Sequence, residues 1–240
     1  MTRHGMLTTF LVVVLIEALL IAYADRPLSD TLRGLENTHP DIINVFRAYT
    51  DLGKSKWYLW PCGLGASLIA FVMHKARLGA KARVRLAHIG AWIFLLFVYV
   101  SVSGLVTDMI KPLLGRARPV ELKEHGIYAF APLTFDARWN SLPSGHATTA
   151  FTLAFALAGF FPRARYPLFA GGALLALSRV IINAHYLSDV VAGAAIAFLT
   201  IWCLRRGRLA GHLFKIIRRI FPLEPLSPEI KATASENTQS

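Results

Sequence analysis

Six apolar segments run through this chain, each close to the length that a helix needs to cross a bilayer. They cover residues 6–24, 57–74, 87–106, 147–161, 167–182 and 190–204. A membrane-spanning helix takes about 20 mostly apolar residues. Lipid offers no hydrogen-bond partners, so each segment must pair its own backbone groups as a helix. The sequence therefore predicts an all-α, polytopic membrane protein, a bundle of six transmembrane helices.

The composition supports this class over a soluble one. Hydrophobic residues make up 55% of the 240 residues and charged residues only 17%, against about 25% charged in an ordinary soluble domain. A soluble domain of this size needs more polar residues to cover its surface, and a disordered chain would be far less apolar. We expect one membrane domain over residues 1–221. The proline-containing end, residues 222–240, is predicted to be a disordered cytoplasmic tail.

The net charge of +12 indicates orientation rather than nucleic-acid binding. Lys and Arg gather on the cytoplasmic side of short loops, and here they follow the second, fourth and sixth segments. With both termini on that side, it carries 15 basic and three acidic residues, and the opposite side 11 basic and 10 acidic. We therefore predict a multi-pass protein of the bacterial inner membrane, with both termini cytoplasmic. Binding of anionic lipid headgroups by residues 215–219 is compatible with this reading.

The N-terminal part leaves alternatives open. The stretch 22–24, Ala-Tyr-Ala, is typical of a signal-peptidase site, although Glu17 interrupts the apolar run before it. Glu17 is either a functional carboxyl or a group protonated or paired within the bundle. Residues 26–53 form either an amphipathic helix on the outer leaflet or a connecting loop. The cysteines, Cys62 and Cys203, fall near opposite ends of their spans and predict neither a disulfide nor a metal site.

Three groups of polar residues fall at the outer ends of the last four segments. The cations Lys111, Arg118 and Arg179 stand where the bilayer begins. A charge there is costly without a partner, and a phosphate suits Arg forks and a Lys point charge. Each cation alone would more often be a topology or headgroup residue. Together, on one face, they indicate an anion site.

The residues at the start of the fourth span and the two histidines also indicate an anion site. Ser144 and Gly145 precede the fourth span, where free backbone N–H groups and the helix dipole favour an anion. Asp189 follows His185 by four residues, so its carboxylate can orient the imidazole as a nucleophile, and His146 can then act as a general acid. A metal site on the same groups is the alternative, but the neighbouring cations would repel an ion.

These residues resemble the signature of the type 2 phosphatidic acid phosphatase (PAP2) superfamily. Its three motifs are Lys-x6-Arg-Pro, Pro-Ser-Gly-His and Ser-Arg-x5-His-x3-Asp. They match residues 111–119, 143–146 and 178–189 at every specified position. The resemblance covers about a third of the chain, and Arg116 is an additional cation without a motif role. It implies a bundle with a PAP2- and haloperoxidase-like catalytic core, needing no metal or other cofactor.

The resemblance also implies roles. His185 would attack phosphorus and form a phosphohistidine, Asp189 would orient it, and His146 would protonate the leaving oxygen and then activate water. The phosphate would be held by the remaining matched residues, Lys111, Arg118, Arg179, Ser144 and Gly145. We expect a periplasmic-face phosphatase with a bell-shaped pH profile. Its substrate would be a lipid phosphate, among them undecaprenyl diphosphate, phosphatidylglycerol phosphate, phosphatidic acid or lipid A phosphate. No nucleic acid and no obligatory protein partner are expected. A lipid phosphotransferase and a non-catalytic lipid-phosphate-binding protein are the alternatives.

Overall fold

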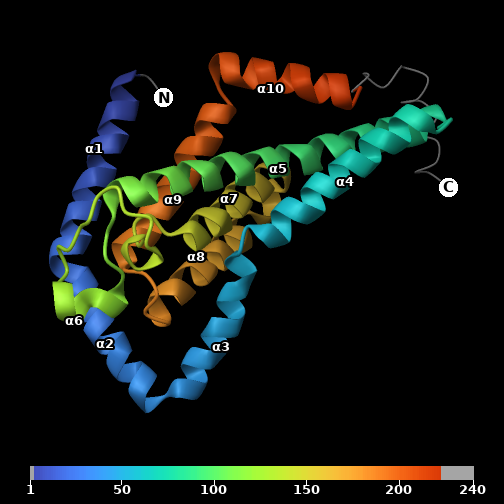
Figure 1. Ribbon diagram of the computed structural model, residues 1–240. Coiled ribbons are helices and arrows are strands. Elements are labelled where there is room, and N and C mark those ends of the chain that lie inside the picture. Colours follow the sequence, from blue (N-terminus) through green and yellow to red (C-terminus); the bar gives the residue numbers. More distant parts are fainter. Residues whose placement is uncertain (1–2, 223–240) are drawn as a thin grey trace. The chain divides into compact units, whose positions relative to one another are not determined.

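The computed structural model describes residues 3–222, in which helices are the main regular elements. Figure 1 shows the helices in order. They are α1 (Arg3–Leu19), α2 (Asp25–Thr38), α3 (Pro40–Thr50), α4 (Lys56–Lys75), α5 (Ala80–Leu114), α6 (Leu122–His125), α7 (Gly145–Phe160), α8 (Arg165–Ile181), α9 (Leu187–Leu204) and α10 (Gly207–Ile220). A π-helical turn, Leu20–Ala24, joins α1 to α2. No strand occurs in residues 3–222, where an isolated β-bridge pairs Arg116 with Phe130. The all-α prediction is confirmed.

Each of the six apolar segments corresponds to a helix within one to a few residues, but the helices differ in length. Within residues 3–222, α5 and α9 are the two that are long and apolar enough to cross a membrane. Helices α1, α7 and α8 have 17, 16 and 17 residues. The six-span arrangement therefore stays a prediction. The predicted tail, residues 222–240, lies outside the described residues except for Pro222.

Residues 26–53 form two helices, so the connecting-loop alternative is wrong. Pro40 begins α3, where its fixed φ suits a first helical turn. The apolar side chains Leu28 and Leu32 of α2 pack against the buried core of α7, α8 and α9. That part of the predicted amphipathic face therefore covers protein rather than the outer leaflet.

The chain forms two compact units. One comprises Met1–Trp57 with Tyr99–Trp202, and the other Tyr58–Val98 with Cys203–Ser240, as far as each is described. Every motif residue belongs to the first unit. The second unit has its own apolar core, in which Phe221 is fully buried and its ring lies 6.2 Å from that of Phe94. The prediction of one domain over residues 1–221 is not tested by this division.

In the first unit, α7 packs against α8 and is hydrogen-bonded to α5. The hydroxyl of Thr107 donates to Thr148 at 3.0 Å, and the hydroxyl of Thr152 donates to Ser103 at 2.9 Å. Such side-chain bonds join helices where apolar attraction between them is weak, as in a bilayer. They fix the end of α5 that carries Lys111 against the helix that begins at Gly145.

The connection from α5 to α7, residues 115–144, is a folded segment rather than a free loop, and we call it the strap. It turns at Gly115, whose φ is +60°, and a Cβ there would lie 1.8 Å from the Ala131 carbonyl oxygen. Only glycine fits this close approach. The amide of Arg118 donates to the Arg138 carbonyl at 2.8 Å, and the amide of Ser141 to the Arg116 carbonyl at 3.0 Å. The strap thereby holds both arginines in fixed places.

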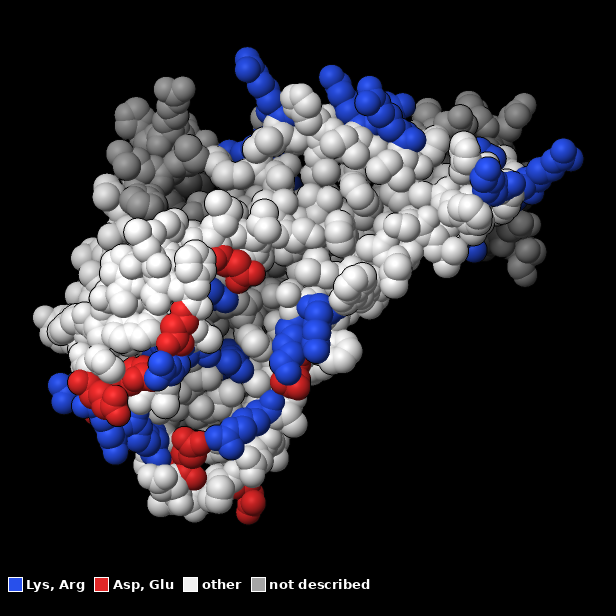
Figure 2. Space-filling model, in the orientation of Figure 1, with Lys and Arg blue, Asp and Glu red and all other residues white. Residues whose placement is uncertain are grey.

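The surface of this unit separates charged from uncharged regions. Figure 2 shows acidic and basic side chains gathered over α2, α3 and α6, whereas the visible surface along α1 is mostly uncharged. Large apolar side chains of α1, among them Leu11, Leu15 and Leu19, are about half exposed. An uncharged surface next to a charged end is typical of a helix bundle that lies in lipid.

Candidate active site

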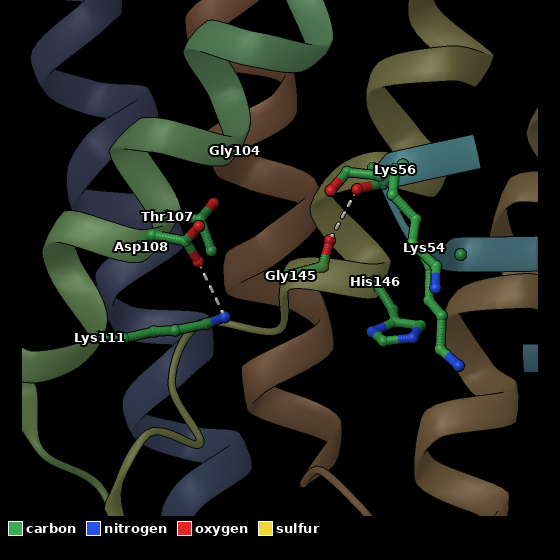
Figure 3. Close-up of a pocket in the computed structure, with 11 residues that line it drawn as sticks. Lys54, Lys56, Gly104, Thr107, Asp108, Lys111, Gly145 and His146 are labelled. Carbon is green, nitrogen blue, oxygen red and sulfur yellow. Dashed lines mark hydrogen bonds and ion pairs between the residues drawn. The ribbon is translucent and has the colours of Figure 1, made fainter. Parts of the chain in front are cut away.

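A cavity of about 270 Å³ opens between α5, α7 and the turn from α3 to α4. Its lining includes three predicted residues, Lys111, Gly145 and His146, together with Lys54 and Lys56. Figure 3 shows the Lys111 amine on one side of Gly145 and the His146 ring on the other. The cavity therefore brings a cation, a helix start and an imidazole together, and all its lining residues belong to the first unit.

The three predicted cations lie near the two predicted histidines. Lys111 and Arg179 interact electrostatically with His146. Arg118 and Arg179 interact electrostatically with His185. Lys111 reaches from the last turn of α5, and its amine is held 3.1 Å from the Asp108 carboxylate. Arg179 ends α8 and donates to the Thr50 hydroxyl at 3.3 Å. Arg118 of the strap interacts electrostatically with Arg179.

Two of these cations offer unused donors. The Nε groups of Arg118 and Arg179 are buried and have no hydrogen-bond partner within the described residues. Mutually repelling guanidinium groups with unsatisfied donors suit a dianion that accepts from both of them.

The first turn of α7 leaves space for a ligand close to its backbone. Ser144 is fully buried, and its hydroxyl caps the helix by accepting from the Ala147 amide at 3.5 Å. The Ser144 amide donates to the Asp189 carbonyl at 2.8 Å, which ties α7 to α9. A Cβ at Gly145 would lie 3.1 Å from the Lys111 amine. Glycine at this position leaves the first turn of α7 open to an anion.

His185 and Asp189 form a pair at the start of α9. The imidazole Nδ1 lies 3.5 Å from the Asp189 carboxylate, and both side chains are buried. This distance is longer than a hydrogen bond, and the contact can tighten in the substrate complex. The amides of Ala184 and His185 donate to the Arg179 carbonyl. With Nδ1 turned to Asp189, Nε2 is the nitrogen available to attack.

His146 packs against the α3–α4 turn. A Cβ at Gly53 would lie only 2.9 Å from the imidazole Cδ2 and 3.1 Å from the His146 Cβ. The imidazole Nε2 is buried, without a hydrogen-bond partner within residues 3–222. The backbone of the turn thus holds one face of the ring, and Nε2 is left available for a substrate oxygen.

Both histidines are neutral near pH 7 in the free protein. Burial lowers the pKa of His185 to about 4, against the opposing effect of Asp189. Burial, then Arg179 and His185, lowers the pKa of His146 to about 3. A neutral His185 is ready to attack. An acidic role for His146 requires that an anion first offset the surrounding cations.

Sequence reasoning missed several groups near the site. Arg116, left without a role, is fully buried and paired with Asp25 and Asp189. Gly53 had no motif signal, because only the folded chain brings it to His146. Glu17 has two buried oxygens without a hydrogen-bond partner among the described residues. Glu17, named from the sequence, interacts electrostatically with Asp189, Asp25 and Arg116. Both alternatives, a functional carboxyl and a group protonated or paired within the bundle, stay predictions.

The chain is similar to known phosphatases. It is 36% identical over 209 residues to the lipid A 1-phosphatase of Rhizobium johnstonii, which covers 82% of this chain and 80% of that protein. It is 37% identical over 194 residues to the lipid A 1-phosphatase of Rhizobium etli, covering 76% and 79%.

A solved structure is similar in fold. It is the crystal structure of a transmembrane PAP2-type phosphatidylglycerolphosphate phosphatase from Bacillus subtilis. The TM-score is 0.56 at 20% identity, and the match covers 88% of this chain and 96% of that one. The model of the PAP2 superfamily matches residues 91–210, which is half of the chain and includes all three motifs. The chain therefore belongs to the PAP2 superfamily.

Proposed function

We propose that the protein is a membrane lipid phosphatase that works through a phosphohistidine on His185. The observation that carries this proposal is the arrangement around His146. Three motifs within residues 111–189 contribute to it, with buried guanidinium donors unpaired among the described residues and a neutral His185 beside the Asp189 carboxylate. Positive side chains supply the charge stabilisation that phosphoryl transfer needs.

The first step transfers the phosphoryl group to the protein. The lone pair on His185 Nε2 forms a bond to phosphorus while the bond from phosphorus to the lipid oxygen breaks. The leaving oxygen takes a proton from His146, so the dephosphorylated lipid departs as a hydroxyl compound. Asp189 stabilises the positive imidazole ring that results. Lys111, Arg118 and Arg179 bind the phosphate oxygens, assisted by the start of α7 at Ser144 and Gly145.

The second step releases phosphate. The oxygen of a water molecule bonds to phosphorus and the P–N bond breaks. His146, neutral after the first step, accepts the water proton, and inorganic phosphate leaves with His185 restored. His146 gives up this proton when phosphate leaves, because its pKa in the free protein is lowered to about 3, and the next substrate binds with uptake of a proton. If a second lipid hydroxyl replaced water, the same intermediate would give a phosphotransferase.

Among lipid phosphates, we place lipid A 1-phosphate first. The two curated relatives are lipid A 1-phosphatases, and their similarity extends over more than three quarters of this chain. We place the site on the periplasmic side of the inner membrane, within six spans. This follows from the basic loops after the second, fourth and sixth apolar segments, which put the motif ends on the opposite face.

The test is phosphate release by the purified protein in detergent with EDTA present. Lipid A 1-phosphate, undecaprenyl diphosphate, phosphatidylglycerol phosphate and phosphatidic acid would be compared by kcat/KM. His185→Ala should abolish release, and His212→Ala, which changes an exposed histidine of α10, should not. Full activity in His185→Ala would refute the mechanism. Radiolabel passing to a second lipid instead of water would favour the transferase.

A further inference from the structure

A fully buried ionic cluster lies behind the Asp189 carboxylate. The Arg116 guanidinium donates to Asp189 at 2.7 Å, to Asp25 at 2.8 Å and to the Ser188 hydroxyl at 2.6 Å. The side chains of Arg116, Asp25 and Asp189 are all 0% exposed. The cluster joins the strap, the start of α2 and the start of α9, three segments far apart in sequence.

Asp25 connects these segments through both of its oxygens. One accepts from the buried Ser188 amide at 3.1 Å, in the first turn of α9. The other accepts from the Ser188 hydroxyl at 2.5 Å and from Arg116. It therefore satisfies a free amide at the start of the helix that carries Asp189. Without Asp25, both Arg116 and the first turn of α9 would lose a hydrogen-bond partner.

The two oxygens of Asp189 have separate tasks. Oδ1 accepts from Arg116, while Oδ2 accepts from the Ser141 hydroxyl at 2.5 Å and the Tyr186 amide at 2.9 Å. Oδ2 is also the oxygen 3.5 Å from His185 Nδ1. The carboxylate is thus held on both sides, and its rotation about the side-chain bond is fixed. The Arg116 backbone contributes as well, because its carbonyl accepts the Ser141 amide.

The charges of the cluster leave Asp189 able to act on His185. An Arg paired with Asp189 alone would neutralise it. Here one guanidinium is shared between Asp25 and Asp189, so these three side chains carry a net charge of −1. The His185 ring gains one positive charge when Nε2 bonds to phosphorus, and the cluster offsets it. Arg116 also lies 4.3 Å from the Tyr186 ring centre, which holds its plane.

Stability alone is a poor reason for such a cluster. Replacing a buried ion group by apolar residues is often neutral or stabilising, because desolvation offsets the attraction. We propose that Arg116 and Asp25 are positioning residues that hold the Asp189 carboxylate against His185 and maintain its negative charge. Neither lines the cavity that holds Lys111 and His146, and both act through Asp189. This inference rests on the proposed phosphohistidine mechanism.

The experiment compares Asp25→Asn, Arg116→Met and the double variant with wild type. Substrate turnover and binding of tungstate, a phosphate analogue, are measured on each full-length protein. We expect kcat to fall on the order of 100-fold, as for a misplacement of about 1 Å, while tungstate affinity and KM change less than about threefold. Asp30→Asn is the matched control, since Asp30 lies on the same helix in an exposed pair with Arg26. Its kcat should be unchanged.

The pH profile provides a readout that a structural role would not move. His185 is faced by Asp189 from α9, Arg179 from α8, His146 from α7 and Arg118 from the strap. Asp25→Asn removes one negative charge from the cluster, so the acid limb of the kcat profile should move to lower pH. Arg116→Met removes a positive charge, so that limb should move to higher pH.

The outcomes separate the two proposals. Wild-type kcat and pH limbs in all three variants would overturn the positioning role while His185→Ala stays inactive. Tungstate binding lost together with activity in all three would also overturn it, because the cluster would then only support the fold. If His185→Ala is itself active, the proposed function fails first, whatever the cluster does.

Discussion

Replacing Gly53 by Ala tests whether the position of His146 matters for protonating the leaving oxygen. A Cβ at residue 53 would lie 2.9 Å from the imidazole Cδ2 and 3.1 Å from the His146 Cβ. Ordinary carbon contacts are about 3.5–4.0 Å, so the ring must move by about 0.5–1 Å. Because the short contacts include the His146 Cβ, rotation of the ring tip alone cannot relieve them.

A displacement of this size should act on catalysis and not on folding. A shift of about 1 Å in a reacting group can cost about 100-fold in rate, so we expect kcat to fall between about 10-fold and 100-fold. The Gly→Ala change reduces the entropy of the unfolded chain by about 0.4–1 kcal/mol where the backbone allows it. Gly53 does not adopt a positive φ, so the thermal midpoint should fall little. KM should change less than kcat, since the cations are untouched.

The assay uses two leaving groups. A lipid phosphate needs a proton on its leaving oxygen, whereas a nitrophenyl phosphate departs as a stable anion and needs none. The rate of the first step is measured as the initial burst of product. In Gly53→Ala this rate should fall with the lipid phosphate and stay at the wild-type value with the nitrophenyl ester. Gly34→Ala is the control, because nothing lies within 4 Å of a Cβ at that position in α2. Equal loss with both leaving groups, or kcat within twofold of wild type with the lipid, would refute the role given to His146.

Three further predictions concern protonation and packing. Tungstate, a dianion at pH 7.5, should bind with uptake of about one proton, measured by calorimetry in buffers of different ionisation enthalpy. The reason is that the anion offsets the cations that lower the pKa of His146 to about 3; His146→Ala should abolish the uptake. Acid should destabilise the protein between pH 6.5 and about 4, because the unfolded His185 binds a proton that the folded one, with its pKa lowered to about 4, does not. The free energy of unfolding should fall by about 3 kcal/mol from this group, and an unfolding midpoint that is constant over this range would contradict the prediction. Phe221→Ala should lower the free energy of unfolding by about 3–5 kcal/mol, since Phe221 is fully buried, whereas Phe214→Ala, at an exposed position, should cost far less in the same thermal assay.

Much of the candidate site could be predicted from local spacing. The four-residue interval from His185 to Asp189 is the one that brings an imidazole to a carboxylate across a helix start, and the structure places them 3.5 Å apart. The sequence likewise predicts Gly145 at the start of a helix, and the structure places it at the first residue of α7. These features depend on neighbours in sequence, which is why a pattern can report them.

The rest depends on contacts that no local pattern encodes. Asp25 binds Ser188 across 163 residues, and nothing about an aspartate after an apolar segment indicates a partner. The apolar stripe with Leu28 and Leu32 predicted an amphipathic helix, but a stripe has the same periodicity whether it faces lipid or protein. The structure shows that these two side chains pack on protein.

The cations near the candidate site divide by their partners, and this division explains how one region can both fold and bind an anion. The terminal nitrogens of Arg116 donate to two carboxylates and a hydroxyl, so its charge is used within the protein even though its Nε also has no partner among the described residues. Arg118 and Arg179 retain buried Nε donors without partners among the described residues, and their charge lowers the pKa of His185. A bound phosphate would satisfy those donors and, by offsetting their charge, favour a protonated His146. Substrate binding would therefore itself produce the acid that the first step requires, so the site would reach its catalytic protonation state only when it is occupied.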